Sequence, residues 1–396
     1  MSFETRPART EEMPEFRRIT ATALIMKPSV FEWVRPEWTF CGFEDGKLAT
    51  SFASIPLTMR FNGGGIPFSG VTCVGSLPQY RRRGHLRKIM CQHFEQLHDK
   101  GEKHIAALWA SLAAIYQRYG YAIVSTRHTY TVEPRYIQFA LPQRPSGNLR
   151  EANEGGFELL SALYTRFVED RIGYIQRPKG MWEYVVLVQP PAGHTLVRTV
   201  YEEGGEPLGY MIYVSWPQPG GSATGHHIGI RDLVWLTPSA YQALWENLAT
   251  MDLMADINWQ RAPADDPLPN LLLEPRKLNA TAADELLARI VDVKALTQRR
   301  YQQEGTLTFE LIDDACPWNS NRWKLEATVE GSRIAATRQS AQATLPASTL
   351  ALLAFGQVSP TEASRMGRMD VLKPDVLPLW DNVMRTMYKP ACVDMF

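Results

Sequence analysis

A cationic turn between an apolar segment and a helix-like segment constrains the fold of this chain more than any other feature. The turn covers residues 77–86 (LPQYRRRGHL). It follows the apolar residues 71–74 and leads into residues 86–100, which we expect to be helical. Such a turn can bind phosphates, because the first N–H groups of a helix are unpaired and carry a partial positive charge. Taken alone, the same residues fit a solvated basic loop equally well, so other features of the chain must decide.

Length and charge balance narrow the class of protein. A chain of 396 residues is longer than one ordinary core, so two or three domains are expected. Its hydrophobic fraction of 45% and charged fraction of 21% are typical of a folded soluble protein. Lys plus Arg and Asp plus Glu both number 42, which argues against a general nucleic-acid binder, since such proteins need a basic excess. The three consecutive arginines are therefore a local feature.

Cysteine usage and the apolar segments predict a cytoplasmic protein without a membrane span. The five cysteines are Cys41, Cys73, Cys91, Cys316 and Cys392. They are odd in number and show no CxxC spacing, so the sequence suggests no disulfide framework and no zinc site. The first residues lack the charged-then-apolar layout of a signal peptide, and no apolar run approaches 18 residues. We expect no bound metal.

The first part of the chain has the pattern of an α/β domain with a mixed sheet. Residues 11–24, 86–100 and 113–119 are expected to be helical, and residues 38–40, 48–55, 66–74 and 104–109 are expected to be strands. Residues 121–132 alternate β-branched and polar side chains, which predicts a closing strand. Residues 141–154 are rich in Pro, Gly, Asn and Arg and are interpreted as a linker.

The middle of the chain is a second α/β unit, and the last part is α+β. Residues 157–172 predict a helix and residues 208–214 a strand. Residues 232–241 resemble a degenerate copy of residues 73–80 without the arginines and the glycine, which indicates a duplicated domain. From about residue 278, helices are expected at 282–294, 293–303, 345–355 and 374–388, with antiparallel strands at 307–312 and 323–329.

Two motifs in the first domain resemble those of acetyltransferases. Residues 79–84 contain the R-x-x-G motif with which GCN5-related N-acetyltransferases (GNATs) bind the pyrophosphate of acyl-coenzyme A, although Leu86 stands where the fuller pattern has Gly or Ala. Backbone amides of residues 82–87 still begin a helix, and arginine side chains can pair with phosphates. Residues 115–121 (IYQRYGY) resemble the region that places a tyrosine beside the thioester sulfur.

These motifs and the three-part layout resemble the enhanced intracellular survival (Eis) family of N-acetyltransferases. The resemblance implies a GNAT domain with an acetyl-CoA site at residues 1–137. It also implies a GNAT-like domain without the cofactor motif at 138–277, and a sterol-carrier-protein-like domain at 278–396. It implies acetyl transfer from acetyl-CoA to primary amines, at one or several positions of a polyamine, aminoglycoside-like or lysine-containing acceptor. It further implies a homohexamer.

The resemblance also implies roles for particular residues. The strand backbone that pairs with pantetheine would be Val74, Gly75 and Ser76. The pyrophosphate cradle would be Arg82, Arg83, Gly84, His85, Leu86 and Arg87. Contacts near the thiol would come from Ser111 and Leu112. The general acid would be Tyr116, and the general base would be the α-carboxylate of Phe396.

General chemistry agrees with the last two roles, because the departing thiolate must gain a proton and the attacking amine must lose one. A tyrosine is protonated at neutral pH and an α-carboxylate is ionised there. Tyr116 could instead be a core aromatic residue, and Phe396 an ordinary apolar terminus. Other histidines, including those at positions 93, 98, 226 and 227, are interpreted as structural or surface residues.

The acceptor pocket and the function class stay open. Acidic candidates for the pocket are Glu32, Glu37, Glu169, Asp170 and Asp394, and aromatic candidates are Trp33, Trp38 and Trp182. One alternative function is a lipid or hydrophobic-ligand binding protein that uses the sterol-carrier-like domain. Another is an acyltransferase with a longer acyl donor, as in N-myristoyltransferases.

Overall fold

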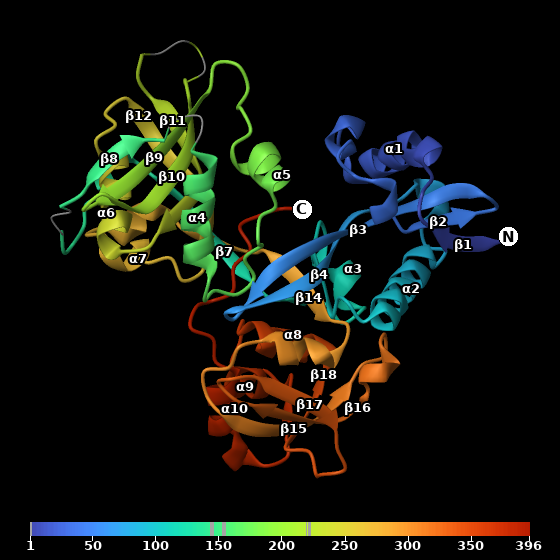
Figure 1. The fold of residues 1–396 in the computed structure, drawn as a ribbon. Coiled ribbons are helices and arrows are strands. Elements are labelled where there is room, and N and C mark those ends of the chain that lie inside the picture. The colour runs from blue at the N-terminus through green and yellow to red at the C-terminus, as the bar shows by residue number, and fades with distance from the viewer. Residues whose placement is uncertain (1, 143–145, 153–155, 219, 221–222) are drawn as a thin grey trace. The chain divides into compact units, whose positions relative to one another are not determined.

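The computed structural model describes residues 2–142, 146–152, 156–218, 220 and 223–396. The chain divides into two compact units. One unit consists of the residues up to 125 together with residues 285–387 and 394–396, and the other of residues 126–284 and 388–393. Strands of the two units form three sheets, which are flanked by helices (Figure 1). No helix among the described residues is long and apolar enough to cross a bilayer.

The first sheet has seven strands in the order β1-β2-β3-β4-β5-β14-β6. They are β1 (Phe3–Arg6), β2 (Cys41–Glu44), β3 (Lys47–Phe61), β4 (Gly64–Ser76), β5 (Ile105–Trp109), β14 (Leu286–Ile290) and β6 (Ala122–Ile123). Neighbouring strands are antiparallel except β4 and β5. A strand from late in the chain therefore lies between two strands from its first third.

Helices cover both faces of the first sheet. Helix α1 (Met13–Leu24) buries Phe16 and Ile19 against one face, where Ala53 and Cys73 of the sheet also point. Helix α2 (His85–Lys100) buries Ile89 and Phe94 against the other face. Because side chains alternate along a strand, successive β3 residues contact different helices. The short helix α3 (Ala113–Gln117) follows β5.

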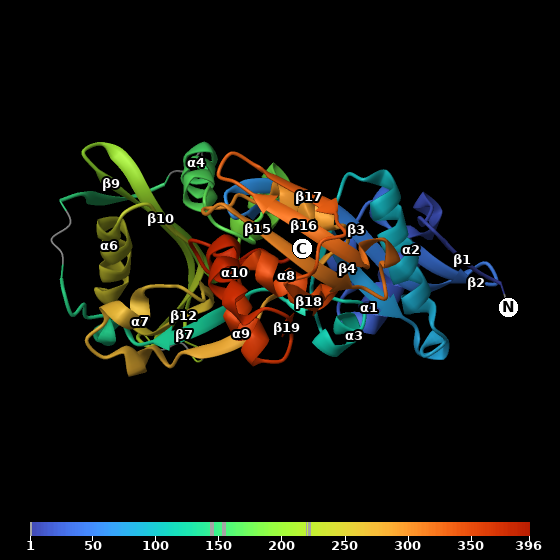
Figure 2. The ribbon, with the colours of Figure 1, turned by 90° about the horizontal axis from the view of Figure 1, so that it is seen from below.

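The second sheet has the order β13-β7-β12-β11-β10-β9-β8. The strands are β7 (Thr126–Val132), β8 (Asn148–Glu151), β9 (Thr195–Glu203), β10 (Glu206–Trp216), β11 (His226–Trp235), β12 (Met254–Pro263) and β13 (Thr281–Asp284). Helices α4 (Phe157–Val168) and α6 (Pro238–Ala249) pack on opposite faces of β9 and β10, as Figures 1 and 2 show. The expected helix at 157–172 and strand at 208–214 are confirmed, with α4 ending earlier and β10 extending further. Shorter helices are α5 (Lys179–Met181) and α7 (Leu268–Leu271).

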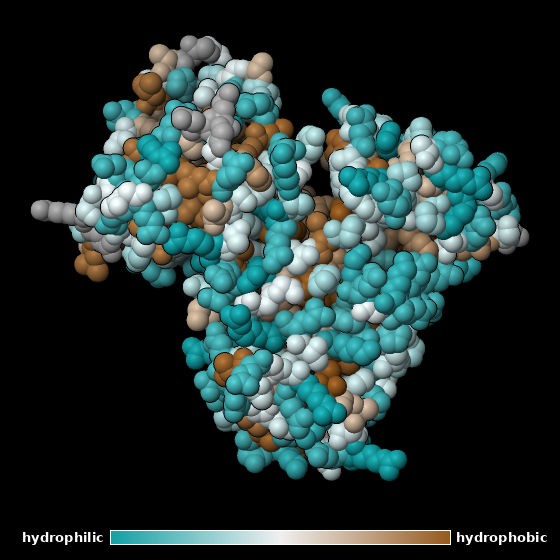
Figure 3. Space-filling view, viewed as in Figure 1, coloured by the Kyte–Doolittle hydropathy of each residue, from teal (hydrophilic) through white to brown (hydrophobic). Residues whose placement is uncertain are grey.

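The third sheet belongs to the last part of the chain and has the order β17-β16-β15-β18-β19. Its strands are β15 (Gly305–Ile312), β16 (Asn321–Ala327), β17 (Ser332–Ala336), β18 (Ala343–Pro346) and β19 (Asp370–Val371), and its helices are α8 (Ala347–Phe355), α9 (Pro360–Arg365) and α10 (Leu377–Met384). Helix α8 is buried almost all round, because it packs against β14 and β6 as well as β18. On the face in Figure 3, the third sheet and its helices present mostly hydrophilic side chains.

Two sequence expectations about the segments that connect the first and second sheets are wrong. Residues 121–132 do not form one closing strand, since β6 lies in the first sheet and β7 in the second. Residues 282–294 are not helical, because they form most of β13, all of β14 and the start of a 3₁₀ helix, Val293–Gln298. Every residue of β14 is buried, and a short run buried on both sides has no periodicity that separates strand from helix.

Candidate functional site

Strands β4 and β5 pair over only three residues. Their ladder joins residues 68–70 to residues 105–107, although β4 continues to Ser76 and β5 to Trp109. Beyond Gly70, the N–H and C=O groups on this edge of β4 therefore have no ladder partner in β5. An extended ligand can pair with such a strand edge. The residues expected to contact pantetheine, Val74, Gly75 and Ser76, all lie on this part of β4.

A β-bulge lies in the same part of β4. Ser51 pairs with Gly75 and Ala53 with Thr72, so two β4 residues lie opposite one β3 residue. The first of the two, Cys73, has a φ of 55°, a conformation that costs a non-glycine residue about 1 kcal/mol or more. Bulges bend a strand and increase its twist. The bulge thus lies just beyond Gly70, where the pairing between β4 and β5 ends.

The side-chain positions of Gly75 and Ser76 are set by packing. A β-carbon on Gly75 would lie 2.5 Å from Cβ of Ala23 in α1, so a glycine is required for this close approach. The Ser76 hydroxyl lies 2.8 Å from that of Thr50. Both residues therefore offer a ligand mainly their backbone groups.

The cationic turn presents the start of α2. Arg82 and Gly84 have φ values of 62° and 81°, and Gly84 is the N-cap of the helix. No side chain caps the first turn of α2 among the described residues. The amides of His85, Leu86 and Arg87 consequently open toward the turn, which suits an anion such as a pyrophosphate.

Side chains of the turn attach it to the sheet. Arg83 Nη1 donates to Glu44 Oε1 at 2.5 Å, and His85 Nε2 lies 2.9 Å from Glu44 Oε2. The His85 ring also stacks on Phe3, with a centroid distance of 4.4 Å. His85 thus has a buried side chain paired with a carboxylate, which leaves its backbone amide for a ligand. The side chains of Arg82 and Arg87 are exposed, as is Gly84.

Tyr116 lies on α3, close in sequence to the exposed residues Ser111 and Leu112. Its side chain is 8% exposed, and burial raises the pKa of its hydroxyl to about 12. The ring packs edge-on against Tyr121, with 6.0 Å between centroids. In the described part of the chain, the Tyr116 hydroxyl has no hydrogen-bond partner. It is a protonated donor that a ligand could engage.

The last residues of the chain lie where the β4–β5 ladder ends. The Phe396 ring packs edge-on against Phe68, with 5.6 Å between centroids. A β-carbon on Gly70 would lie 2.9 Å from this ring. The carbonyl of Asp394 accepts a hydrogen bond of 3.0 Å from Trp109 Nε1. Residues 285 positions apart thus meet at the end of β5.

The acceptor candidates from the sequence are scattered. The acidic side chains of Glu32, Glu37, Glu169 and Asp170 are exposed, whereas Asp394 is buried. Trp182 lies in the core of the second sheet's α4 face. A cavity of about 350 Å³ in the first unit is lined by Glu37 and Trp38 together with other residues, none of which belongs to the predicted donor set.

The structure also places the histidines singled out above. His93 is buried beside Ser69, and burial lowers its pKa to about 3. His98 stacks on Trp318 and pairs with Asp292. His227 pairs with Asp256, and His226 accepts from the Gln218 amide. Within the described ranges, no group of three or more metal-ligating side chains occurs.

Comparison with known proteins identifies the class. Models of the acetyltransferase (GNAT) domain match residues 4–124 and 173–290, and a model of the sterol carrier protein domain matches residues 293–393. An uncharacterized N-acetyltransferase of Streptomyces avermitilis is 31% identical over 80% of this chain and 78% of that protein. A chain with two such domains is a GCN5-related N-acetyltransferase, and this fold implies acetyl-CoA as the co-substrate.

Two further relatives narrow the family. N-acetyltransferase Eis of Mycobacterium tuberculosis is 30% identical over 59% of this chain and 58% of that protein. The crystal structure of Eis1 from Mycobacterium abscessus superposes with a TM-score of 0.85 at 25% identity, and the match covers 100% of both chains. The chain belongs to the Eis family of N-acetyltransferases. The predicted fold class and enzyme class are thereby confirmed, while the limits 1–137, 138–277 and 278–396 and the site roles stay predictions.

Several residues of the site escaped the sequence analysis. Glu44 binds the turn, Gly70 admits the Phe396 ring, and Trp109 binds the last residues. Their partners lie from 39 to 326 positions away, beyond any local pattern. Cys73 carries no signal either, because its left-handed backbone is unusual for a residue other than glycine.

Proposed function

We propose that this enzyme transfers the acetyl group of acetyl-CoA to primary amines. The acceptor would be a small polyamine, an aminoglycoside-like molecule or a lysine side chain, acetylated at one or several positions. The observation that carries the proposal is that Phe396 and Asp394 contact β4 and β5 where the ladder of these strands ends. A carboxylate at the end of Phe396 would then lie near the reacting groups.

For donor binding we propose two sets of backbone groups. The unpaired edge of β4 at Val74, Gly75 and Ser76 would bind the pantetheine arm. The uncapped amides at the start of α2 would bind the pyrophosphate, with the exposed side chains of Arg82 and Arg87 adding charge. Ser111 and Leu112 are exposed just before α3 and would contact the thiol end.

Two proton transfers accompany the reaction that we propose. The amine nitrogen forms a bond to the acetyl carbon while the carbon–sulfur bond breaks. The proton of the amine passes to the α-carboxylate of Phe396, directly or through water, and the Tyr116 hydroxyl donates a proton to the departing sulfur. Both groups return to their starting states by exchange with solvent. Burial raises the pKa of the Tyr116 hydroxyl to about 12, so the hydroxyl carries its proton at neutral pH and can donate it.

The mechanism is tested with Tyr116→Phe and with deletion of Phe396. Each change should lower kcat by about 100-fold or more, because Tyr116→Phe removes the proton donor and the deletion moves the α-carboxylate one residue back, to Met395. Binding of acetyl-CoA, measured by calorimetry, should not change. Thiol release measures turnover.

Tyr121→Phe is the matched control for Tyr116→Phe. Tyr121 contacts Tyr116, is fully buried, and has a hydroxyl without a partner among the described residues. This control should keep wild-type turnover. Full activity of Tyr116→Phe and of the shortened chain would contradict the assigned roles.

The acceptor is best identified by a screen with thiol-release detection. Polyamines, aminoglycosides, simple primary amines and lysine peptides should be compared at equal concentration. Mass spectrometry of the products would count the acetyl groups added. A donor series with longer acyl chains belongs in the same screen, because preference for a long chain would replace acetyl transfer with acyl transfer.

We also propose that the enzyme is a homohexamer and that it works in the cytoplasm. Family resemblance supports a homohexamer, which sedimentation velocity would establish or contradict. Among the described residues no disulfide joins any of the five cysteines, and four of them are buried, which supports a reducing compartment such as the cytoplasm. Fractionation of the producing cells would test this location.

A further inference from the structure

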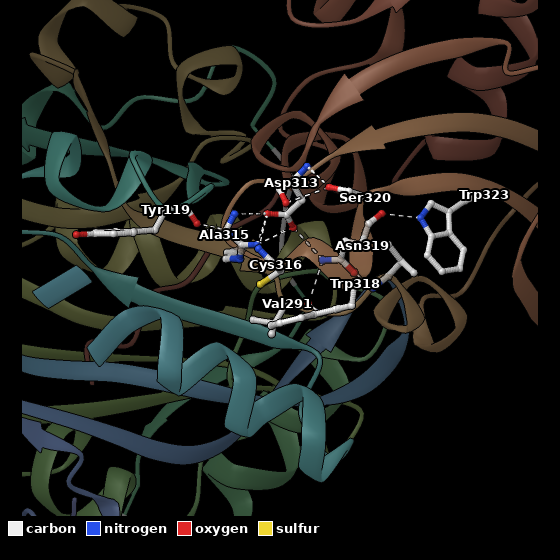
Figure 4. Close-up of polar contacts among 11 residues, drawn as sticks. Tyr119, Val291, Asp313, Ala315, Cys316, Trp318, Asn319, Ser320 and Trp323 are labelled. Atoms are coloured by element: carbon white, nitrogen blue, oxygen red, sulfur yellow. Dashed lines mark hydrogen bonds and ion pairs between the residues drawn. The ribbon is translucent and has the colours of Figure 1, made fainter. Parts of the chain in front are cut away.

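A buried ion pair links the last part of the chain to the turn that follows α3. Arg289 of β14 donates from Nη2 to both carboxylate oxygens of Asp313 at 2.6 Å. Figure 4 shows Asp313 among its polar contacts. The side chains are 0% and 2% exposed. Burying such a pair gives little net stability, because the desolvation of both charges offsets their attraction. Stability alone therefore does not explain its presence.

A second nitrogen of the Arg289 guanidinium binds the backbone directly after α3. Its Nη1 donates to the carbonyl oxygen of Tyr119. Gly120 adopts a φ of +79°, and a β-carbon there would lie 2.4 Å from Nη1, so this contact requires glycine. The guanidinium also lies over the ring of Phe94 in α2, 4.6 Å from its centroid. Arg289 is therefore fixed by α2, the α3 turn and Asp313 together.

Asp313 is itself held in one orientation by its own loop. Its Oδ1 accepts from the amides of Ala315 and Cys316 at 3.2 and 3.0 Å. Its Oδ2 accepts from Asn319 Nδ2 at 2.9 Å, and this amide also donates to the Val291 carbonyl (Figure 4). The carboxylate thus has a fixed position relative to β14 and can fix the guanidinium in turn.

Helix α3 depends for its stability on contacts with the rest of the protein, such as the hydrogen bond from Arg289 to Tyr119. It has only five residues and its N-cap, Leu112, makes no side-chain capping bond. Helices this short are not stable by themselves. The Tyr119 amide bonds to the Tyr116 carbonyl, so the segment held by Arg289 is bonded directly to the tyrosine.

We infer that Arg289 and Asp313 are positioning residues for Tyr116, through which the sterol-carrier-like part of the chain fixes the direction of the tyrosine hydroxyl. The inference rests on the proposed role of Tyr116 as proton donor. It assigns that part of the chain a function in catalysis besides supplying Phe396. Neither residue touches the substrates in this scheme.

A double-mutant cycle tests the inference. Asp313→Asn keeps the shape of the side chain but removes its charge, and it should lower kcat by about 10- to 100-fold through misplacement of the hydroxyl. The Kd for acetyl-CoA should change by less than about twofold, since the proposed pyrophosphate and pantetheine contacts lie at the start of α2 and on β4. In the Tyr116→Phe background, Asp313→Asn should lower kcat no further, because the group it positions is absent.

Two further variants protect the test against simple misfolding. Arg289→Lys keeps the charge beside Asp313 but cannot also bind the Tyr119 carbonyl, and it should lower kcat in the same selective way. Asp232→Asn is the matched control. It breaks an ion pair with Arg177 that is equally short, 2.6 Å, and nearly as buried, but that belongs to the other unit. This control should lower the melting temperature without changing kcat.

The outcomes separate this inference from the proposed function. Wild-type kcat in Arg289→Lys, or equal losses from Asp313→Asn with and without the Tyr116 hydroxyl, would overturn the positioning role alone. A fully active Tyr116→Phe would overturn the proton-donor role and the positioning role with it. If Asp313→Asn does not fold, Arg289→Lys carries the same cycle.

Discussion

Individual residues of the site are constrained by partners that are distant in sequence. Gly70 lies in the last β4 residues that pair with β5, and the Phe396 ring and Leu57 occupy the space beside its α-carbon. A side chain at this position would have to displace that ring. The position of the chain's last residue is therefore set by a glycine far from it in the sequence.

Gly70→Ala should lower turnover more than stability. The added methyl group would lie about 3 Å from the Phe396 ring and would shift it, and a shift of about 1 Å can cost 10- to 100-fold in rate. Steady-state kinetics and thermal unfolding measure the two effects. Gly305→Ala serves as the control, because its methyl group on β15 would be crowded at least as closely, 2.5 Å from Val383 of α10. Equal rate losses in both variants would contradict the prediction.

A buried carboxyl makes the second unit sensitive to pH. Asp266 accepts from the Tyr241 hydroxyl and the Leu268 amide, yet burial raises the pKa of its carboxyl to about 7, against about 4 in an unfolded chain. The folded state thus binds the proton more tightly. The resulting stability is complete below about pH 4 and is lost as the pH rises through about 7.

Asp266→Asn should therefore stabilise the protein relative to wild type increasingly as the pH rises from 5 to 7.5. The difference in unfolding free energy should grow by at most about 1.4 kcal/mol per pH unit. Calorimetry of both proteins at several pH values measures this difference. A difference that does not depend on pH would count against the buried carboxyl as its cause.

The sequence could single out site residues only where the pattern is local, and the roles of those residues stay predictions. Tyr116 and the turn at residues 82–87 stand in short motifs, and the structure brings both into one unit with Phe396. Asp313 and Arg289 could not be predicted, since their importance arises from contacts with Tyr119 and with each other. An isolated Asp or Arg in a sequence is usually a surface residue.

At the scale of elements, the cationic turn owes its shape to two left-handed residues. Arg82 and Gly84 both have positive φ, and only the second is a glycine. The strained conformation at Arg82 costs about 1 kcal/mol or more, and strain of this kind often marks a functional site. The turn thereby directs the first amides of α2 outward.

Gly84→Ala should weaken acetyl-CoA binding with little loss of stability. Nothing lies within 4 Å of the position that the new β-carbon would take, so only the backbone conformation is penalised, by about 1 kcal/mol. A change of φ would turn the helix amides away from a pyrophosphate. The Kd for acetyl-CoA should rise by about 10-fold, measured by calorimetry.

Gly101→Ala is the matched control for Gly84→Ala. Gly101 ends the same helix with a φ of +64° and is also uncrowded, so it carries the same backbone penalty at the opposite end. An equal effect of the two substitutions on the Kd would contradict a role of the turn in binding.

At the scale of the whole molecule, the chain crosses between the first and second sheets twice. Successive strands β6 and β7 belong to different sheets, and so do β13 and β14. Sequence patterns predicted that two α/β units exist, because helix and strand periodicities are local. They could not predict the exchange, because β14 differs from a buried helical segment only in its hydrogen-bond partners, β5 and β6.

A fragment that ends at residue 125 should not fold by itself. It would lack β14, and β5 and β6 would then have no strand between them. We expect no cooperative thermal transition and poor near-ultraviolet circular dichroism. Co-expression with residues 126–396 should restore a soluble complex, because that piece supplies β14. A sharp transition in the fragment alone would show that the sheet closes without this strand.

The place of β14 also has a consequence for the newly made chain. Ribosomes add about 5–20 residues per second, so β5 must wait on the order of 10–40 s before β14 has been synthesised. During that interval β5 presents an unpaired edge, which other strands can join. The yield of active enzyme should thus depend on how well the cell protects this edge, and slower translation between β6 and β14 should lower it.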